Sequence, residues 1–148
     1  MNSVLRYGLL MILALVFITA CTSSQDLERM IPYENMTNEF SLEIPKSWEE
    51  KYDVEEEANR IVFAHRASRP GGILFIIEKW SRDKWSEEGE ALSQIIHLTK
   101  LGEKNDTIFS WATPTDVQYI PDDEASKQEY LEMFTEVESI KSSFQFKE

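Results

Sequence analysis

Cysteine is nearly absent from this chain: its 148 residues include one, Cys21. A lone cysteine has no partner for an internal disulfide, so the fold must rest on its apolar core. Positive charge is also scarce, since 15 Lys and Arg face 27 Asp and Glu, for a net charge of −12. A nucleic-acid binder needs a basic face, and anionic lipid surfaces attract basic residues, so this balance argues against both kinds of partner.

Long hydrophobic runs are absent as well. The longest uncharged, mostly apolar run, residues 8–20, has 13 residues and follows Arg6. A membrane-spanning helix needs about 20 residues, so this run has the length of a cleavable signal segment instead. It ends in Ile18-Thr19-Ala20, directly before Cys21. This arrangement resembles the signal of bacterial lipoproteins.

The resemblance implies a lipobox at Ile18, Thr19 and Ala20 and acylation, for example with palmitate, at Cys21. Two or three acyl chains would hold the mature protein firmly on the outer side of the cell membrane, because each buried methylene contributes about 0.8 kcal/mol. The alternative is an ordinary signal peptide that leaves Cys21 as a free thiol or removes it.

The composition predicts three segments: a signal peptide at 1–20, a lipidated cysteine with a flexible tether at 21–32, and one globular domain at 33–148. The small polar residues 22–26 are typical of a tether, whose end-to-end distance would be about 20 Å. Eight Phe, five Tyr and four Trp indicate a packed domain and not a disordered acidic tail.

The middle of the chain is typical of antiparallel strands. Residues 40–44 alternate apolar and polar side chains, the period of a half-buried strand, and Pro45 ends the run. Residues 73–77 are continuously apolar, which favours a central strand covered on both faces. We further expect two hairpins and a short helix: a hairpin from 52–56 and 60–65, a helix within 81–92 that ends before Gly89, and a hairpin from 94–101 and 107–113.

The last element is expected to be a long amphipathic helix. Apolar residues recur at spacings of three and four, which places them on one face of a helix; they are Tyr130, Met133, Phe134, Val137, Ile140 and Phe144. Asp122 or Ser126 is expected to cap the start, and Ser126 with Glu129 fits a capping box. Strands followed by a long helix predict an α+β domain with a mainly antiparallel β-sheet flanked by helices.

Four segments carry a further resemblance: Phe40-x-Leu42-x-Ile44-Pro45-x-x-Trp48, Gly72-x-Leu74-Phe75-x-Ile77, residues 113–119 and residues 130–144. Together they resemble small exported bacterial lipoproteins whose domain is similar to the PsbP-like α/β/α sandwich. The resemblance spans residues 33–147 and is most specific at 113–119. It implies a mainly antiparallel sheet with helices on its faces. It implies no function, because known members range from a photosystem subunit to a GTPase-binding protein.

The chain has no recognisable catalytic signature: there is no Gly-x-Ser-x-Gly elbow and no glycine-rich phosphate loop. The two histidines, His65 and His97, are expected within strands and lack the spacing of metal ligands, so we expect no metal and no cofactor. Asp122-Asp123-Glu124 is a weaker candidate, as a calcium site with oxygen donors. Acidic residues at a helix start are also favoured by the helix dipole, and that interpretation is preferred.

The four tryptophans are the remaining candidates for a binding surface, because an indole has a flat apolar face and a polar edge. Trp48 and Trp111 lie in apolar segments, and we expect them in the core. Trp80 and Trp85 lie in a charged segment and are the better candidates for a surface that binds a sugar or a peptide.

The sequence therefore predicts a membrane-anchored envelope lipoprotein without enzymatic activity. Its acidic domain is expected to bind an envelope protein with a basic surface or a cell-wall component. A small-ligand or calcium-binding domain, using Trp80 and Trp85 or residues 122–124, is the first alternative. A hydrolase with a site assembled from scattered residues is the second.

Overall fold

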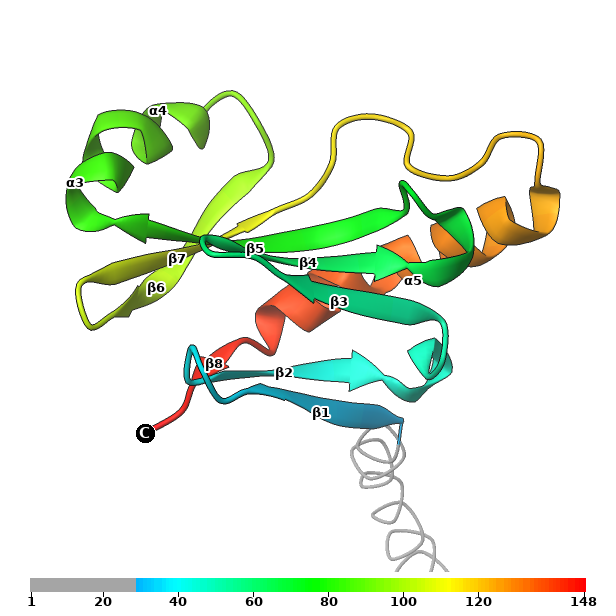
Figure 1. Ribbon diagram of the computed structural model, residues 1–148, viewed down its shortest axis with the longest axis horizontal. Helices are drawn as coiled ribbons and strands as arrows, with labels where there is room; N and C mark the ends of the chain where they lie inside the picture. Colours follow the sequence, from blue (N-terminus) through cyan, green and yellow to red (C-terminus); the bar gives the residue numbers. More distant parts are fainter. Residues whose placement is uncertain (1–28) are drawn as a thin grey trace, which may run out of the picture. The chain divides into compact units, whose positions relative to one another are not determined.

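A computed structural model describes residues 29–148 of the chain (Figure 1). The signal segment, the lipobox, Cys21 and the first part of the tether lie outside these residues. Residues 31–148 form one compact unit. Within it the protein is α+β, with two antiparallel sheets and a long C-terminal helix, which confirms the predicted fold class in this coarse form. The expected mainly antiparallel sheet is divided into a three-stranded sheet A and a five-stranded sheet B.

Sheet B has the strand order β3-β4-β5-β7-β6. The bounds are Tyr52–Glu56 for β3, Arg60–His65 for β4, Ile73–Ser81 for β5, Leu98–Lys104 for β6 and Thr107–Ala112 for β7. All neighbours are antiparallel. The β3–β4 hairpin is confirmed, and the apolar run at 73–77 lies in the central strand, as predicted.

Sheet A joins segments from the two ends of the described chain. Its strands are β1 (Met30–Asn35), β2 (Phe40–Pro45) and β8 (Gln145–Phe146), in the order β1-β2-β8. Strand β8 pairs with the start of β2, at Phe40 and Ser41. Strand β1 begins at Met30, so residues 30–32 belong to a strand and not to the tether to which the sequence assigned them.

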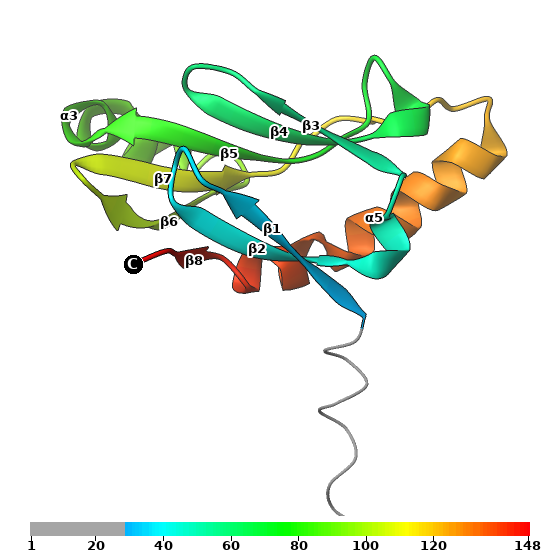
Figure 2. The ribbon, with the colours of Figure 1, turned by 60° about the horizontal axis from the view of Figure 1, so that its bottom comes forward.

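Helix α5 (Glu124–Ser142) lies on the same side of sheet B as sheet A (Figure 2). The predicted apolar face is confirmed, because Tyr130, Met133, Val137 and Ile140 are buried against both sheets. Phe134 and Phe144 are only partly buried, and Phe144 lies beyond the end of the helix. The phenol of Tyr130 also donates a 2.8 Å hydrogen bond to the carbonyl of Ile73, which ties α5 to β5.

A row of stacked aromatic rings crosses the inner face of sheet B. The ring of Phe75 is stacked between Phe63 at 4.3 Å and Trp111 at 4.0 Å, measured between ring centroids. Trp48 follows β2 in the 3-10 turn η1 (Lys46–Trp48) and is fully buried beside Phe75. Trp48 and Trp111 are therefore core residues, as predicted, and the burial of such large side chains replaces the missing disulfide as the source of stability.

The opposite face of sheet B is covered in part by a short helical segment. It consists of α3 (Arg82–Lys84), the π-helical turn η3 (Trp85–Gly89) and α4 (Glu90–Leu92). The prediction that this helix ends before Gly89 is wrong. Gly89 lies inside the helical segment because the Trp85 ring packs against it, where a Cβ atom would be 2.5 Å from Trp85 Cε3.

Two further expectations are corrected by the structure. Strand β6 begins at Leu98 and not at 94, because residues after α4 continue in turns that hydrogen-bond back to Leu92, and His97 lies outside the strand. The N-cap of α5 is Asp123, whose carboxylate accepts a 3.0 Å hydrogen bond from the amide of Ser126. Neither Asp122 nor Ser126 is the cap, and the capping box is wrong.

Candidate functional site

Three hairpin turns meet at one end of the two sheets, beside the end of β5 (Figure 1, left side). They are the β1–β2, β3–β4 and β6–β7 turns. Between them lies an open groove of about 550 Å³, which we call the turn-end groove. Its lining comes from residues 37–39, 58–59, 79–81 and 104–107 and from Phe109. This volume lies within the range of about 300–1,000 Å³ typical of small-molecule sites.

The backbone of these turns is unusual. Four non-glycine residues of the described chain have positive φ, and three of them, Glu39 (52°), Asn105 (50°) and Asp106 (61°), line the turn-end groove. Asn and Asp tolerate this conformation because their short side chains bond locally, whereas Glu does not gain this compensation. Positive φ at both Asn105 and Asp106 is what a two-residue hairpin turn between the paired Lys104 and Thr107 requires, so it sets the shape of the groove rim and does not by itself indicate a function.

The lining combines uncharged hydrogen-bonding groups with apolar surface. The amide side chains are Asn38, Asn59 and Asn105, the hydroxyl groups belong to Thr37, Thr107 and Ser81, and Phe109, Trp80 and Ala58 are apolar. An amide both donates and accepts, and a hydroxyl does the same. Such a surface fits a ligand with several neutral polar groups rather than a hydrocarbon.

Two lysines lie in the groove in different surroundings. Lys104 Nζ forms a 3.0 Å ion pair with Glu39 and donates to the carbonyl of Lys147. Lys79 Nζ donates a 3.1 Å hydrogen bond to Asn38 Oδ1 and, within residues 29–148, forms no ion pair with a carboxylate. Since an ammonium group has three N–H donors, Lys79 keeps donors for a bound acceptor.

Trp80 lies at the junction of the groove with a second hollow of about 340 Å³. The two hollows share four lining residues, Asn59, Lys79, Trp80 and Ser81. The indole Nε1 of Trp80 donates a 2.8 Å hydrogen bond to Ser110, which fixes the orientation of the ring. Of the two tryptophans proposed from the sequence as a binding surface, Trp80 is partly exposed, and its ring lies on the face of sheet B opposite to the Lys79 ammonium.

The neighbouring Trp85 has a different position. Its side chain is 5% exposed and belongs to a buried cluster with Leu98, Ile108 and Ala112. Its ring meets that of Trp80 edge to face, with centroids 5.7 Å apart. Trp85 therefore packs against the Trp80 ring from the buried side and lines neither hollow.

The second hollow carries more charge than the first. Arg60, Glu78 and Lys84 line it together with the shared residues, and the Lys84 ammonium lies 5.5 Å from the Trp80 ring centroid. Burial raises the pKa of Glu78 above its ordinary value, and the nearby Arg60 and Lys84 oppose this shift. The Lys84 ammonium forms no ion pair with an acid in the described chain, whereas the neighbouring Lys79 ammonium reaches Asn38 on the opposite face of sheet B.

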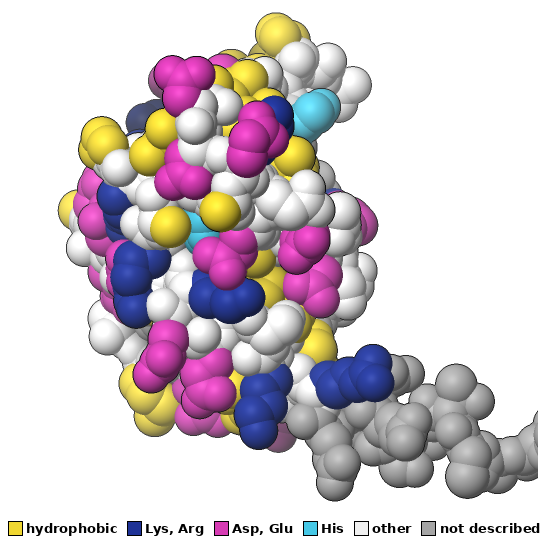
Figure 3. All heavy atoms as spheres, turned by 90° about the vertical axis from the view of Figure 1, so that its right-hand side faces the viewer, with side chains coloured by type: hydrophobic (Ala, Val, Ile, Leu, Met, Phe, Trp, Pro, Cys, Tyr) yellow, Lys and Arg dark blue, Asp and Glu magenta, His cyan; other side chains and the backbone are white. Residues whose placement is uncertain are grey.

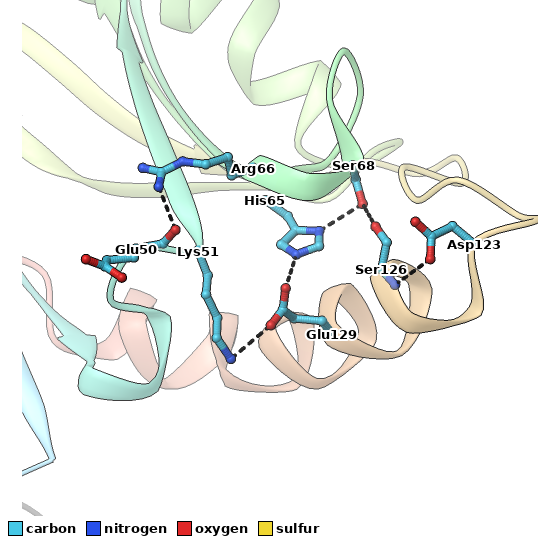
Figure 4. A network of polar contacts seen from close by, with 8 residues as sticks. All are labelled: Glu50, Lys51, His65, Arg66, Ser68, Asp123, Ser126 and Glu129. Atoms are coloured by element: carbon cyan, nitrogen blue, oxygen red, sulfur yellow. Dashed lines mark hydrogen bonds and ion pairs between the residues drawn. The ribbon is translucent and has the colours of Figure 1, made fainter.

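A second polar constellation lies at the opposite end of sheet B (Figure 4). His65, 0% exposed, contacts Ser68 Oγ through Nδ1 at 2.8 Å and Glu129 Oε2 through Nε2 at 2.9 Å. Glu129 also forms a 3.0 Å ion pair with Lys51, and Ser68 Oγ lies 3.1 Å from Ser126 Oγ. We call these five residues the His65 network.

A serine, an imidazole and a carboxylate in a row resemble a nucleophilic triad, but this row is not an active site. Ser68 is 2% exposed, its hydroxyl is already bonded to both His65 and Ser126, and it lines neither hollow described above. A nucleophile must reach its substrate, and this one does not. The network instead joins β4 and the 3-10 turn η2 (Arg66–Ser68) to α5.

A hollow of about 370 Å³ lies beside α5, and its one lysine, Lys51, is paired with Glu129. Figure 3 shows that face with acidic and basic side chains intermingled on it. Arg66 pairs with Asp53 at 2.8 Å, Arg69 with Glu55 at 2.9 Å, and Lys51 with Glu129. The charges at this end neutralise one another, in contrast to Lys79 in the turn-end groove.

The acidic triplet Asp122-Asp123-Glu124 lies at the start of α5. Asp123 is the N-cap, and Glu124 pairs with Lys127 at 3.3 Å. Within residues 29–148 there is no group of three or more His, Cys, Asp or Glu side chains placed to hold a metal ion, and that includes Asp122, Asp123 and Glu124. Asp123 thus contributes to the helix start as its N-cap.

No protein-family model matches the chain, and neither a curated protein nor a solved structure is significantly similar to it. In the part of the chain that the structure describes, no helix has both the length and the apolar character needed to cross a membrane. The case for a function therefore rests on the residues of the chain itself.

Proposed function

We propose that this protein is a lipid-anchored bacterial envelope lipoprotein whose domain, of PsbP-like α/β/α type, binds a cell-wall component without enzymatic chemistry. The signal-like residues 8–20 and the Ile18-Thr19-Ala20-Cys21 sequence support the anchor. The α+β architecture with helices on both faces of sheet B supports the comparison with the PsbP-like domain.

The observation that carries the binding role is the turn-end groove. It brings together three amide side chains, one from each of three hairpin turns, and the unpaired Lys79 of β5. A concave site with a few convergent polar groups is the usual form of a ligand site. Each turn joins two hydrogen-bonded strands, so the sheets position the polar groups of the groove.

A wall component fits this groove better than a basic protein surface does. The net charge of −12 favours basic partners for the domain as a whole. The groove differs from the rest of the surface, because Lys79 and Lys104 balance Glu39 and Asp106 in its lining. A hydrolase is not favoured, since the one serine–histidine–carboxylate row in residues 29–148 is buried.

The anchor is tested by labelling cells with a fatty-acid probe. The wild-type protein is expected to carry the label and to sediment with membranes. Cys21→Ser is expected to accumulate as an unlabelled, unprocessed precursor. Normal maturation and membrane association of Cys21→Ser would show that the protein is not a lipoprotein.

The groove is tested by retention of the full chain, in detergent, on purified wall fragments. Asn105→Gly removes an amide and keeps the positive φ of the turn, because glycine adopts it without cost. Combined with Lys79→Gln, this change is expected to lower retention at least about tenfold. Lys46→Gln, an exposed lysine at the opposite end of β2, is the matched control. Equal retention of all three proteins would remove the groove from the proposal.

A further inference from the structure

We infer that the ligand of the turn-end groove is a saccharide that carries an acidic group, and that Lys79 binds this group. The inference rests on the proposed binding role of the groove and specifies its ligand class. Three properties of the lining carry it: unoccupied neutral donors and acceptors, one unpaired ammonium, and acidic side chains that limit how much negative charge the ligand can have.

The neutral groups point to a polyhydroxylated ligand. Asn59 and Asn105 belong to different hairpin turns, and within the described residues neither side chain forms a hydrogen bond. Thr37 and Thr107 add hydroxyl groups in the same groove. Neighbouring hydroxyl groups of a sugar donate and accept at once, and amides and hydroxyls are the side chains that match both roles.

The Trp80 ring lies apart from these groups. Lys79 and Trp80 are consecutive in β5, so their side chains point to opposite faces of sheet B. Lys79 lies opposite Phe109 on the inner face, whereas Trp80 packs against Trp85 on the outer face, where the second hollow also contains Lys84. The ligand of the groove is therefore recognised by the groove residues around Lys79.

The acidic group is inferred from the surroundings of Lys79. In the same region Arg60 pairs with Glu57 at 2.8 Å, Arg82 with Asp106 at 3.0 Å, and Lys104 with Glu39. In a chain with a net charge of −12, the half-buried Lys79 has an amide oxygen as its neighbour instead of a carboxylate. A ligand carboxylate would supply the missing partner and form a charge-assisted hydrogen bond.

The same lining argues against a polyanion. Glu39 and Asp106 stand in the groove and Glu78 in the second hollow, so a polymer with one charge on every unit would be repelled. Lys79, the unpaired basic group of the groove, suffices for an isolated acidic group. This favours a glycan with neutral units between acidic ones over a phosphate polymer.

The test measures how tightly each of two tetrasaccharides binds to the full chain in detergent. Binding is followed by isothermal titration and by Trp fluorescence. One is a hyaluronan tetrasaccharide, in which N-acetylglucosamine alternates with glucuronate, and the other is the neutral chitin tetrasaccharide. The acidic probe is expected to bind about tenfold more tightly, the value of one charge-assisted hydrogen bond, and the preference should shrink as salt is added.

Three variants test whether Lys79 causes the preference for the acidic probe. Lys79→Gln is expected to bind both probes equally, at the affinity of the wild type for the neutral one. Asn105→Gly should weaken the binding of both probes to the same extent, and Lys46→Gln should bind both probes as the wild type does. Equal binding of both probes by the wild type, or a preference that survives in Lys79→Gln, would overturn the inference.

Other outcomes separate this inference from the proposed function. If neither saccharide binds but wall fragments are still retained through the groove, the ligand class is wrong and the binding role stands. If neither saccharide binds and the groove also does not retain the protein on wall fragments, the proposed function and the ligand class both fail. Inorganic phosphate is the third probe: if it binds at Lys79 as tightly as the acidic saccharide, the site is a simple anion site and the saccharide assignment is overturned.

Discussion

The imidazole of His65 lies 2.9 Å from the carboxylate of Glu129, although 64 residues separate them in the sequence. His65 is the last residue of β4, and Glu129 lies on the second turn of α5. The contact therefore fixes the position of the helix against the end of sheet B. Because the imidazole is fully buried and both ring nitrogens have partners, the pairing is one of the constraints that define the fold.

Replacement of His65 by Ala should be strongly destabilising. It leaves a cavity and deprives Ser68 and Glu129 of their partner, at a cost of about 2–4 kcal/mol in the free energy of unfolding. His97→Ala is the matched control, because that histidine is exposed, and its effect should stay within about 0.5 kcal/mol. Urea unfolding measures both, and equal effects of the two substitutions would show that the His65 network does not stabilise the domain.

Glu129 should make the stability depend on acidity. The hydrogen bond from His65, and then the contact with Lys51, hold the pKa of Glu129 below its ordinary value of 4.5. The unfolded chain then takes up the proton at a higher pH than the folded one, so this contribution is complete above pH 4.5 and is lost as the pH falls through the lower, folded pKa. Glu129→Gln should therefore show a flatter decline of stability below pH 4.5 than the wild type. Parallel declines in urea unfolding would contradict this.

The two most deeply buried tryptophans should respond differently to the same substitution. Trp48 Nε1 donates a 2.7 Å hydrogen bond to Glu136, whereas Trp111 Nε1 is buried without a partner among the described residues. Trp→Phe removes similar volume at both positions, but only Trp48→Phe breaks a hydrogen bond to a charged group. We expect Trp48→Phe to cost about 1–2 kcal/mol more than Trp111→Phe in urea unfolding. A larger cost at Trp111 would refute this.

Gly89→Ala is expected to lower the stability of the domain, which is the opposite of the usual effect of a Gly→Ala change within a helix. Within a helix this change normally stabilises a protein by about 0.5–1 kcal/mol. Here the new methyl group would lie 2.5 Å from Trp85 Cε3 and displace the ring that supports Trp80. We expect a lower melting temperature and a changed near-UV circular dichroism signal. Ser86→Ala, at an exposed position of the same π-helical turn, should change neither.

Local patterns in the sequence were sufficient for β2, the β3–β4 hairpin, β5 and the long helix, but not for β1, for β8 or for the start of β6. The β3–β4 hairpin and the apolar face of α5 follow from periodicity within a few residues. The division into two sheets was not accessible in this way. It depends on β8 pairing with the start of β2, a contact between residues more than a hundred positions apart.

The capping error has a similar cause. Ser126 and Glu129 have the spacing of a capping box, but both side chains contact β4 and η2 instead, through Ser68 and His65. Tertiary contacts took precedence over a local motif. The only sequence signal for the network was the spacing of three between His65 and Ser68, repeated between Ser126 and Glu129.

The candidate site was found only in part. Trp80 was recognised from its charged surroundings, but the same argument selected Trp85, which is buried beneath it. The asparagines of the groove carried no signal, because single polar residues in hairpin turns are common. Their convergence is a property of three turns from distant parts of the chain.

The attachment of the C-terminal residues has a practical consequence for work on this protein. The amide of Lys147 donates to the carbonyl of Glu39, and its carbonyl accepts from Lys104, so the chain leaves the domain at the rim of the groove. An affinity tag or fluorescent fusion appended after Glu148 would begin one residue from this contact and stand in the way of ligands.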